Sequence, residues 1–317
     1  MLHCLSRRLG TARPCRTLHY SARQRRLLCT TSESAPPPSA SACLGAGLAG
    51  GGFGGLVGIG GGAIMVPIMT SVAKMTQHQA VGTSSAAVAG TGLAGMVSFG
   101  SAGAVDLGAA AALASTAMLT ARFGARFTQR FNPVQLQRAF ACFQLAVGPL
   151  VPLKAQLVER RKVAGGVADE TRAAANDASA PAAASPPQLV PDAARAQQLL
   201  MLAGVGVAAG FASGMFGIGG GVILTPALCL LTEMPHACVL GTTLASMVPP
   251  SLVSAATHRQ MGNVVTGAVA PLVLGSAVGA AVAGQLAVRS PEEPLQWGFA
   301  AFLVLTGGRK LWTLRGL

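Results

Sequence analysis

The chain contains 317 residues, of which 51% are hydrophobic and only 10% are charged. Because an average soluble domain has about 25% charged residues, this composition excludes a water-soluble globular protein of this size. The 41 glycines and the low aromatic content of 4% favour closely packed membrane helices instead.

The positive charge of the chain is concentrated near its start. The formal net charge of +13 includes seven arginines within the first 32 residues. Without them, 16 basic residues face 10 acidic ones, and the remaining charge of +6 is ordinary for a membrane protein. We therefore expect membrane lipid around the chain and no nucleic-acid partner. The seven arginines are Arg7, Arg8, Arg13, Arg16, Arg23, Arg25 and Arg26.

The first 32 residues have the composition of an organelle transit peptide. They are rich in Arg, Ser and Thr, contain no acidic residue, and lack the apolar run of a secretory signal. We predict that residues 1–42 are a transit peptide and linker, and that the protein is a multi-pass protein of the mitochondrial inner membrane. A plastid signal, or a disordered tail on a plasma-membrane protein, is the alternative.

Two blocks of apolar sequence, residues 43–153 and 197–317, are separated by a polar stretch. About 20 helical residues cross a membrane, so the charge-free runs predict four transmembrane elements per block. Residues 154–196 are rich in Ala, Pro, Asp and Ser, and we expect a disordered loop there. The predicted fold is an all-α polytopic membrane protein of two homologous halves. The charge-free runs cover 43–73, 75–105, 107–121, 139–153, 196–232, 234–258, 260–288 and 294–308.

The two blocks share an internal repeat. At an offset of 159, the segment GLVGIGGGAIMVPIM at 55–69 aligns with GMFGIGGGVILTPAL at 214–228. The ungapped alignment of 55–86 with 214–245 contains 12 identities in 32 positions. The glycines, the proline and a later Gly-Thr pair match between the two segments in one register. This match indicates a duplicated membrane unit.

The repeated glycine segment should break its helix. Each glycine costs about 1 kcal/mol and proline about 3 kcal/mol relative to alanine in a helix. A broken backbone is tolerated in lipid only where protein or an aqueous cavity surrounds it. We expect backbone N–H groups at 60–62 and 219–221 to bind an anion at the membrane midplane. The alternative is that these glycines only allow close helix packing.

Hydroxyl residues follow the glycine segments at matching positions. Gly82, Thr83 and Ser84 correspond to Gly241, Thr242 and Thr243. Their hydroxyls can donate to a substrate oxygen, or can cap the helix and bond to a carbonyl one turn back. Seven scattered cysteines without a CxxC pair predict no metal site, no disulfide framework and no cofactor. No catalytic constellation is evident, so an enzyme is not expected.

The doubled GxxGIGGG segment, with its proline and Gly-Thr pair, resembles the sulfite exporter TauE/SafE family. The similarity covers about 44–153 and 197–313, and it implies a carrier of sulfite, thiosulfate, sulfoacetate or organosulfonates. The implied substrate-binding residues are Gly58, Gly60, Gly61, Gly62, Pro67, Gly82, Thr83, Ser84, Gly217, Gly219, Gly220, Gly221, Pro226, Gly241, Thr242 and Thr243.

The predicted function is secondary transport of a small sulfur-containing anion by alternating access. An anion channel and a non-transporting structural protein of an organelle membrane are the alternatives. The halves are parallel if each glycine segment crosses the membrane, and inverted if it turns back. The coupling ion, the orientation and a homo-oligomeric assembly stay open.

Overall fold

The computed structural model describes residues 39–146, 149, 192–232, 234–287 and 292–314. These residues are helical and include no β-strand, which confirms the predicted all-α class. Four of the described helices are long and apolar enough to cross a membrane. The predicted transit peptide and most of the predicted middle loop lie outside the described residues. The four candidate spans are Ala40–Val57, Gln77–Gly100, Ala237–Gln260 and Thr266–Ala287.

The helices of the two blocks correspond one to one at the offset of 159. The first block contains α2 (Ala40–Val57), α3 (Gly62–Ser71), α4 (Gln77–Gly100), α5 (Leu107–Phe127), the 3-10 turn η1 (Thr128–Arg130) and helical residues 133–146. The second block contains α7 (Asp192–Phe216), α8 (Gly221–Leu231), α9 (His236–Gln260), α10 (Thr266–Ala287) and α11 (Glu292–Leu314).

Each block has five helical segments among the described residues, where the charge-free runs indicated four. The difference arises because the runs 43–73 and 196–232 each contain two helices, separated at the glycine segment. Helix α7 also begins within the stretch 154–196 that was predicted as a loop. Its first turns are rich in alanine and glutamine, which are good helix formers.

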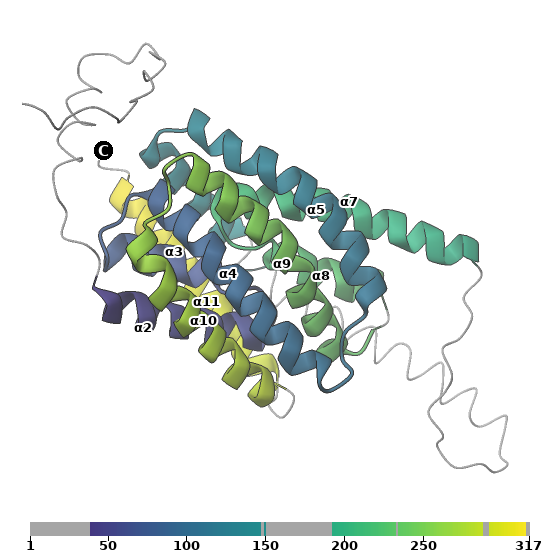
Figure 1. Cartoon of the computed structure of the whole chain (residues 1–317). Helices are drawn as coiled ribbons and strands as arrows, with labels where there is room; N and C mark the ends of the chain where they lie inside the picture. The colour runs from purple at the N-terminus through teal and green to yellow at the C-terminus, as the bar shows by residue number, and fades with distance from the viewer. Residues whose placement is uncertain (1–38, 147–148, 150–191, 233, 288–291, 315–317) are drawn as a thin grey trace, which may run out of the picture. The chain divides into compact units, whose positions relative to one another are not determined.

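Helices α4 and α9 form an antiparallel central pair (Figure 1). Early in α4 the hydroxyl of Ser85 lies 3.0 Å from that of Ser254, near the end of α9. Late in α4, Gly95 faces Leu244, near the start of α9. Since α4 and α9 occupy equivalent places in the two blocks, these helices have the opposite directions that inverted halves require.

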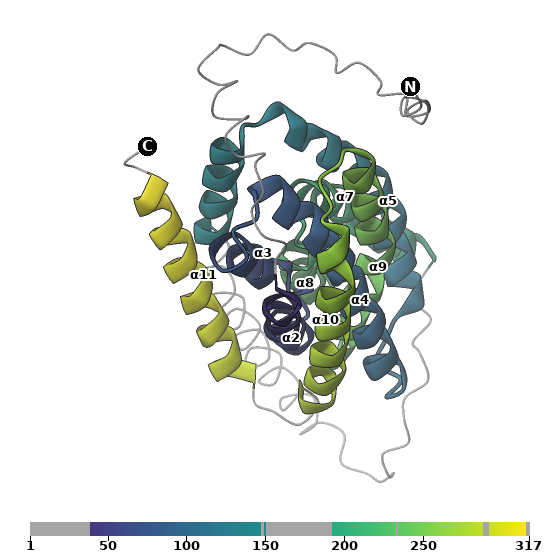
Figure 2. The same cartoon turned by 60° about the vertical axis from the view of Figure 1, so that its left-hand side comes forward.

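Each block packs its first helix against the other block. Helix α2 runs beside α10, and α7 runs beside α5 (Figures 1 and 2). A Cβ atom on Gly51 would lie only 2.1 Å from the Ser276 carbonyl oxygen, and one on Gly210 only 2.2 Å from that of Ala117. Glycines therefore allow the backbones of the two blocks to touch. They recur every four residues, at Gly47, Gly51 and Gly55 and at Gly206, Gly210 and Gly214.

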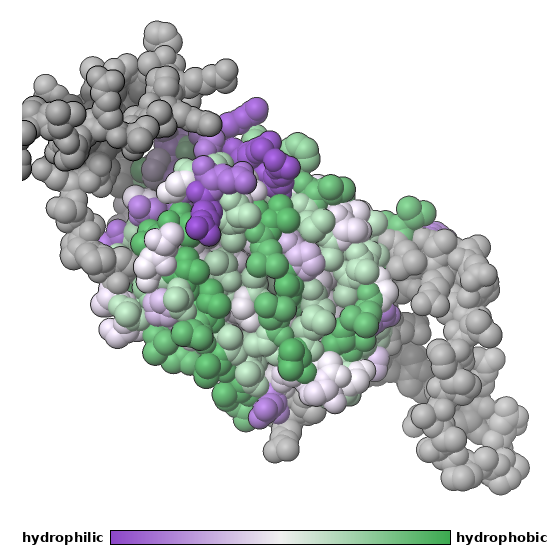
Figure 3. Space-filling view, viewed as in Figure 1, coloured by the Kyte–Doolittle hydropathy of each residue, from purple (hydrophilic) through white to green (hydrophobic). Residues whose placement is uncertain are grey.

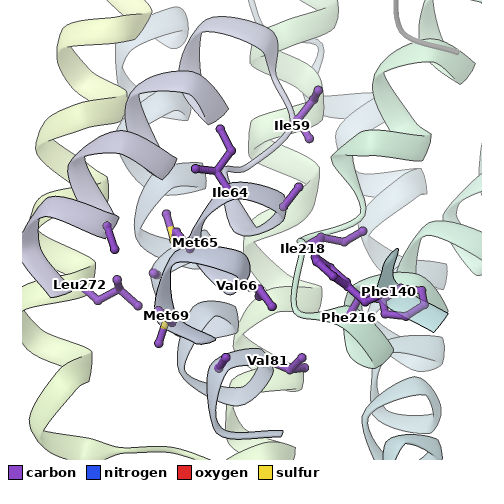
Figure 4. Close-up of a cluster of buried hydrophobic side chains, with 14 of the residues drawn as sticks. Ile59, Ile64, Met65, Val66, Met69, Val81, Phe140, Phe216, Ile218 and Leu272 are labelled. Carbon is purple, nitrogen blue, oxygen red and sulfur yellow. The ribbon is translucent and has the colours of Figure 1, made fainter. Parts of the chain in front are cut away.

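A hydrophobic core holds the short helix α3 between the longer ones. Met65 and Met69 of α3 are almost fully buried and belong to the same cluster as Leu272 of α10. In the same cluster Ile218 lies beside Phe216 and Phe140 (Figure 4). The core therefore joins both glycine-broken segments to helices of both blocks.

Most described cationic residues lie at one end of the helix bundle. Figure 3 shows hydrophilic residues gathered at that end, with hydrophobic residues along the sides. Hydrogen bonds connect the helices at that end. The ring Nε2 atom of His78 lies 3.2 Å from the Thr128 carbonyl oxygen, and Lys310 donates to the Thr70 hydroxyl. We call this the cationic end. It includes Lys74, Arg122, Arg126, Arg130, Arg138, Arg259, Arg309 and Lys310.

Candidate functional site

Each glycine segment is a tight turn that reverses the chain. Helix α2 ends at Gly58, and Gly58, Gly60 and Gly61 have φ angles of 73°, 80° and 74°. Glycine adopts such left-handed conformations without the strain that a side chain would cause. Helix α3 then runs back along α2, because a Cβ on Gly50 would lie 2.4 Å from the Met65 side chain. The segment is therefore a re-entrant hairpin.

The second block repeats this geometry at α7 and α8. Gly217, Gly219 and Gly220 have φ angles of 67°, 81° and 80°. A Cβ on Gly220 would lie 2.7 Å from the carbonyl oxygen of Ala209, the position equivalent to Gly50. We call the two segments, 58–62 and 217–221, the glycine turns. Both turns use left-handed residues to bring a helix N-terminus back into the protein.

The two glycine turns contact each other. The Thr225 hydroxyl donates a 2.9 Å hydrogen bond to the carbonyl oxygen of Gly58. The Ser84 hydroxyl donates a 3.0 Å bond to the carbonyl oxygen of Gly217, and Gly62 lies against that same carbonyl. Hydroxyls of one block thus anchor the turn of the other block.

The glycine turns meet beside the midpoints of the central helix pair. A Cβ on Gly60 would lie 2.9 Å from Met247 Sδ and 3.1 Å from the side chain of Val88. Val88 is halfway along α4, Met247 is halfway along α9, and both are fully buried. They are also equivalent to one another at the offset of 159. This contact therefore lies near the middle of two of the four candidate spans.

The N-termini of α3 and α8 start at this meeting point. The carbonyl oxygen of Gly61 accepts from Ile64 and Met65, which are the third and fourth residues of α3. Within the described part of the chain, no residue accepts a hydrogen bond from the backbone amides of Gly62 and Ala63. Such free amides and the positive end of the helix dipole suit an anion. The same pattern recurs at α8, where Gly220 accepts from Ile223 and Leu224.

Pro67 and Pro226 lie inside the short helices α3 and α8. Proline has no N–H, so Pro67 leaves the carbonyl of Ala63, four residues earlier, without its helical partner. The Gln144 side chain supplies that partner, since its Nε2 atom donates a 3.1 Å bond to the Ala63 oxygen. Gln144 is buried, and sequence reasoning did not select it. The sequence signal for Gln144 was an amide side chain within an apolar run.

The two Gly-Thr pairs hold loops of the opposite block. The Thr83 hydroxyl accepts from the Val265 amide at 3.2 Å, and that of Thr242 accepts from the Asp106 amide at 2.9 Å. Val265 and Asp106 are equivalent residues just before α10 and α5. The glycines before them, Gly82 and Gly241, allow close approach to the same loops at Asn263 and Ala104.

The structure therefore brings Ser84 to the glycine turns and places Thr83 and Thr242 at the interblock loops. Thr243, the equivalent of Ser84, is fully buried, and its hydroxyl has no hydrogen-bond partner among the described residues. Sequence reasoning missed Thr225, Val88 and Met247. A hydroxyl in an apolar helix was the signal for Thr225, and no sequence signal distinguishes the other two from ordinary core residues.

An all-helical chain of two inverted blocks, whose broken helices meet halfway along the central spans, has the architecture of a membrane transporter. The family model described as "Sulfite exporter TauE/SafE" matches residues 15–150 and 202–316. The chain belongs to this family, and the resemblance inferred from the glycine segments is confirmed. The match begins within the stretch predicted as a transit peptide.

Two bacterial relatives carry transporter names. A "Probable membrane transporter protein" of Haemophilus influenzae is 39% identical over 80 residues, which cover 22% of this chain and 30% of that relative. The "Probable membrane transporter protein YunE" of Bacillus subtilis is 26% identical over 229 residues, covering 69% of this chain and 77% of YunE. The alignment thus spans under a third of the first relative's length. No solved structure matches the chain.

Family and relatives together identify an integral, multi-pass membrane transporter rather than an enzyme.

Proposed function

We propose that the protein is a secondary transporter of small sulfur-containing anions, of the sulfite, thiosulfate, sulfoacetate or organosulfonate class. The observation that carries this proposal is the meeting of two helix N-termini, with free amides at Gly62 and Ala63, beside the midpoints of α4 and α9. Backbone amides bind an oxyanion without placing a formal cation in the membrane. The family description, sulfite exporter, points to the same chemistry.

The central side chains support an alternating-access mechanism. Val88 and Met247 fill the space between the glycine turns and are fully buried. An anion can reach the amides only when these side chains and the hairpins around them move. We further infer that the blocks arose by duplication, since their helices match at one offset. Two inverted blocks can exchange conformations and so open the centre first to one side and then to the other.

Transport by purified protein in liposomes tests the proposal. Uptake of radiolabelled sulfite, thiosulfate and sulfate is compared under imposed proton and sodium gradients, with protein-free liposomes as the control. Accumulation above the external concentration supports a secondary transporter. Flux that only equilibrates the anion indicates a channel. No flux of these three anions, nor of sulfoacetate or an organosulfonate, indicates a structural role.

A second part of the proposal concerns the compartment. The seven arginines and the absence of acidic residues among the first 32 residues favour import into mitochondria or plastids. Fusing residues 1–42 to a fluorescent reporter tests this proposal, because an import signal directs the reporter to one organelle. Uniform cytosolic fluorescence would contradict it.

A further inference from the structure

The central helix pair differs between the two sides of the glycine turns at one matched pair of positions, which is polar on one side and apolar on the other. Toward the cationic end, the Ser85 hydroxyl lies 3.0 Å from that of Ser254. The equivalent positions toward the opposite end hold Leu244 and Gly95, which pack on each other. The offset of 159 relates Ser85 to Leu244, and Ser254 to Gly95. Inverted blocks would give two similar halves, so this difference distinguishes the two approaches to the centre.

A second difference between equivalent positions of the central helix pair is His258, a polar residue. It is fully buried in the last turns of α9, and its equivalent in the first block is Phe99, also fully buried. Its ring Nε2 atom lies 2.9 Å from the carbonyl oxygen of Gly214. Because a carbonyl can only accept, Nε2 carries the hydrogen, and Nδ1 bears the lone pair of the neutral ring. Nδ1 has no hydrogen-bond partner among the described residues.

Other buried hydroxyls continue from His258 toward the glycine turns. Ser251 and Ser254 lie two and one helical turns before His258, on the same face of α9. The Ser251 hydroxyl is fully buried and has no partner in the described part of the chain. It lies 3.6 Å from the place of a Cβ on Gly219. Buried polar groups are normally hydrogen-bonded, so the Ser251 hydroxyl and His258 Nδ1 are free to bind a polar ligand.

We propose that His258, Ser254, Ser85 and Ser251 form the entry path for the transported anion at the cationic end, and that His258 binds the anion when its Nδ1 is protonated. This inference rests on the proposed function. Protonation turns Nδ1 from an acceptor into a charged donor, which binds an anion strongly. The hydroxyls of Ser254 and Ser251 then offer successive donors on the way to Gly219.

The charges around His258 agree with an entry site for anions. Among the described side chains of α4, α5 and α9, the bases are His78 of α4, Arg122 and Arg126 of α5, and Arg259 of α9 itself. The neighbouring residues of α7 at Gly214 are uncharged, as is Asn263. Asp106, at the opposite end of α5, is the only acidic residue whose side chain the structure describes. The local field therefore attracts anions to this end.

The pH dependence of exchange tests the inference. Liposomes loaded with unlabelled thiosulfate exchange it for labelled thiosulfate at equal pH on both sides, so no proton gradient contributes. Thiosulfate stays fully ionised across the range, so any pH effect belongs to the protein. We expect the KM of the unmodified protein to be about tenfold lower at acid pH than at alkaline pH, because protonation of His258 adds a charged hydrogen bond to the anion.

Three variants separate the entry site from a structural histidine. His258→Gln keeps a donor for the Gly214 carbonyl but cannot titrate, so its KM should stay at the alkaline value throughout. His78→Gln, a partly exposed histidine of α4 at the same end, should keep the normal pH dependence. Ser254→Ala should raise the KM at both pH values and keep the pH dependence, because it removes a hydroxyl and not the titrating group.

The possible failures are distinguishable. Absence of exchange by the unmodified protein at every pH, with thiosulfate and in turn with sulfite, sulfoacetate and an organosulfonate, refutes the proposed function itself. Exchange with a pH-independent KM refutes only the entry site, as does normal pH dependence in His258→Gln. If His258→Gln does not reach the membrane, an unchanged KM in Ser254→Ala overturns the inference.

Discussion

The close contact between α2 of the first block and α10 of the second can be tested by a glycine-to-alanine substitution, which adds a single methyl group. Gly51 of α2 faces α10, and a Cβ there would lie 2.1 Å from the Ser276 carbonyl oxygen and 2.5 Å from its Cα. Real Cβ contacts do not fall below 3.0 Å, so the helices must separate by about 0.9 Å. Both atoms belong to backbone, so no side chain can rotate away. Overpacking of this kind costs about 3 kcal/mol.

The neighbouring residue provides a matched control. A Cβ on Gly52 would come no closer than 4.0 Å to any atom, here the Gly279 oxygen. Gly52→Ala should therefore stabilise the protein by up to about 1 kcal/mol through helix propensity. The midpoint of thermal unfolding, followed in detergent by the loss of monodisperse protein on size exclusion, should be lower in Gly51→Ala by on the order of 10 °C. Equal midpoints would refute the close approach of α2 and α10.

Two further predictions concern hydrogen bonds within the first block. Asp106→Ala should lower the unfolding free energy by about 1 kcal/mol, measured by the same thermal assay, because the carboxylate caps α5 through the Ala109 amide at 3.0 Å; Asp106→Asn should lose less. Gln144→Leu should cost about 1–3 kcal/mol, because it leaves the buried Ala63 carbonyl without a donor. Leucine occupies the equivalent position, Leu303, so a stability unchanged in Gln144→Leu would mean that this carbonyl needs no donor.

Much of the architecture follows from the sequence because it depends on local rules. Charge-free runs located the membrane helices, and four glycines with a proline located the breaks at 58–62 and 217–221. Whether a break crosses the membrane or turns back depends on which helix surface accepts the returning segment. The glycine at position 50, which receives Met65, carries that information only once the fold is known. The inverted arrangement therefore could not be predicted.

The candidate site was predictable in its backbone and not in its side chains. Left-handed glycines have a sequence signature, whereas Val88 and Met247 resemble any core residue until the turns are seen to meet beside them. The shared motif predicts either a substrate contact or a capping role for the hydroxyls of Thr83 and Thr242, and the structure shows them accepting from backbone amides of the opposite block. A motif that occurs in both blocks shows that two positions are equivalent. It does not show whether those positions form a binding site or a contact between the blocks.

The structure also determines how an anion site at the centre must be tested. Alanine at Gly61 would place a Cβ 2.1 Å from the Gly50 oxygen, and alanine at Gly220 would place one 2.7 Å from the Ala209 oxygen. Both changes would disturb the hairpins whether or not an anion binds there. A change that preserves the turns must therefore come from the side chains that face them.

Val88→Thr is such a change, since threonine has nearly the shape of valine and its hydroxyl can bond to the carbonyl of Ser84 one turn earlier. Val88 lies against Gly60, Gly62 and Gly219, so the new hydroxyl adds a donor beside the free amides. The hydroxyl has one hydrogen, so it donates either to that carbonyl or to the anion. If the anion binds there, the hydroxyl can exchange the carbonyl for the charged anion, the stronger acceptor, and the KM for thiosulfate should fall about two- to tenfold. Val248→Thr, at a buried position of α9 that faces Gly92 and not the glycine turns, should leave the KM unchanged. Since both variants bury one extra hydroxyl, a general loss of stability would affect them alike. A KM that shifts equally in both, or in neither, would place the anion elsewhere than at the glycine turns.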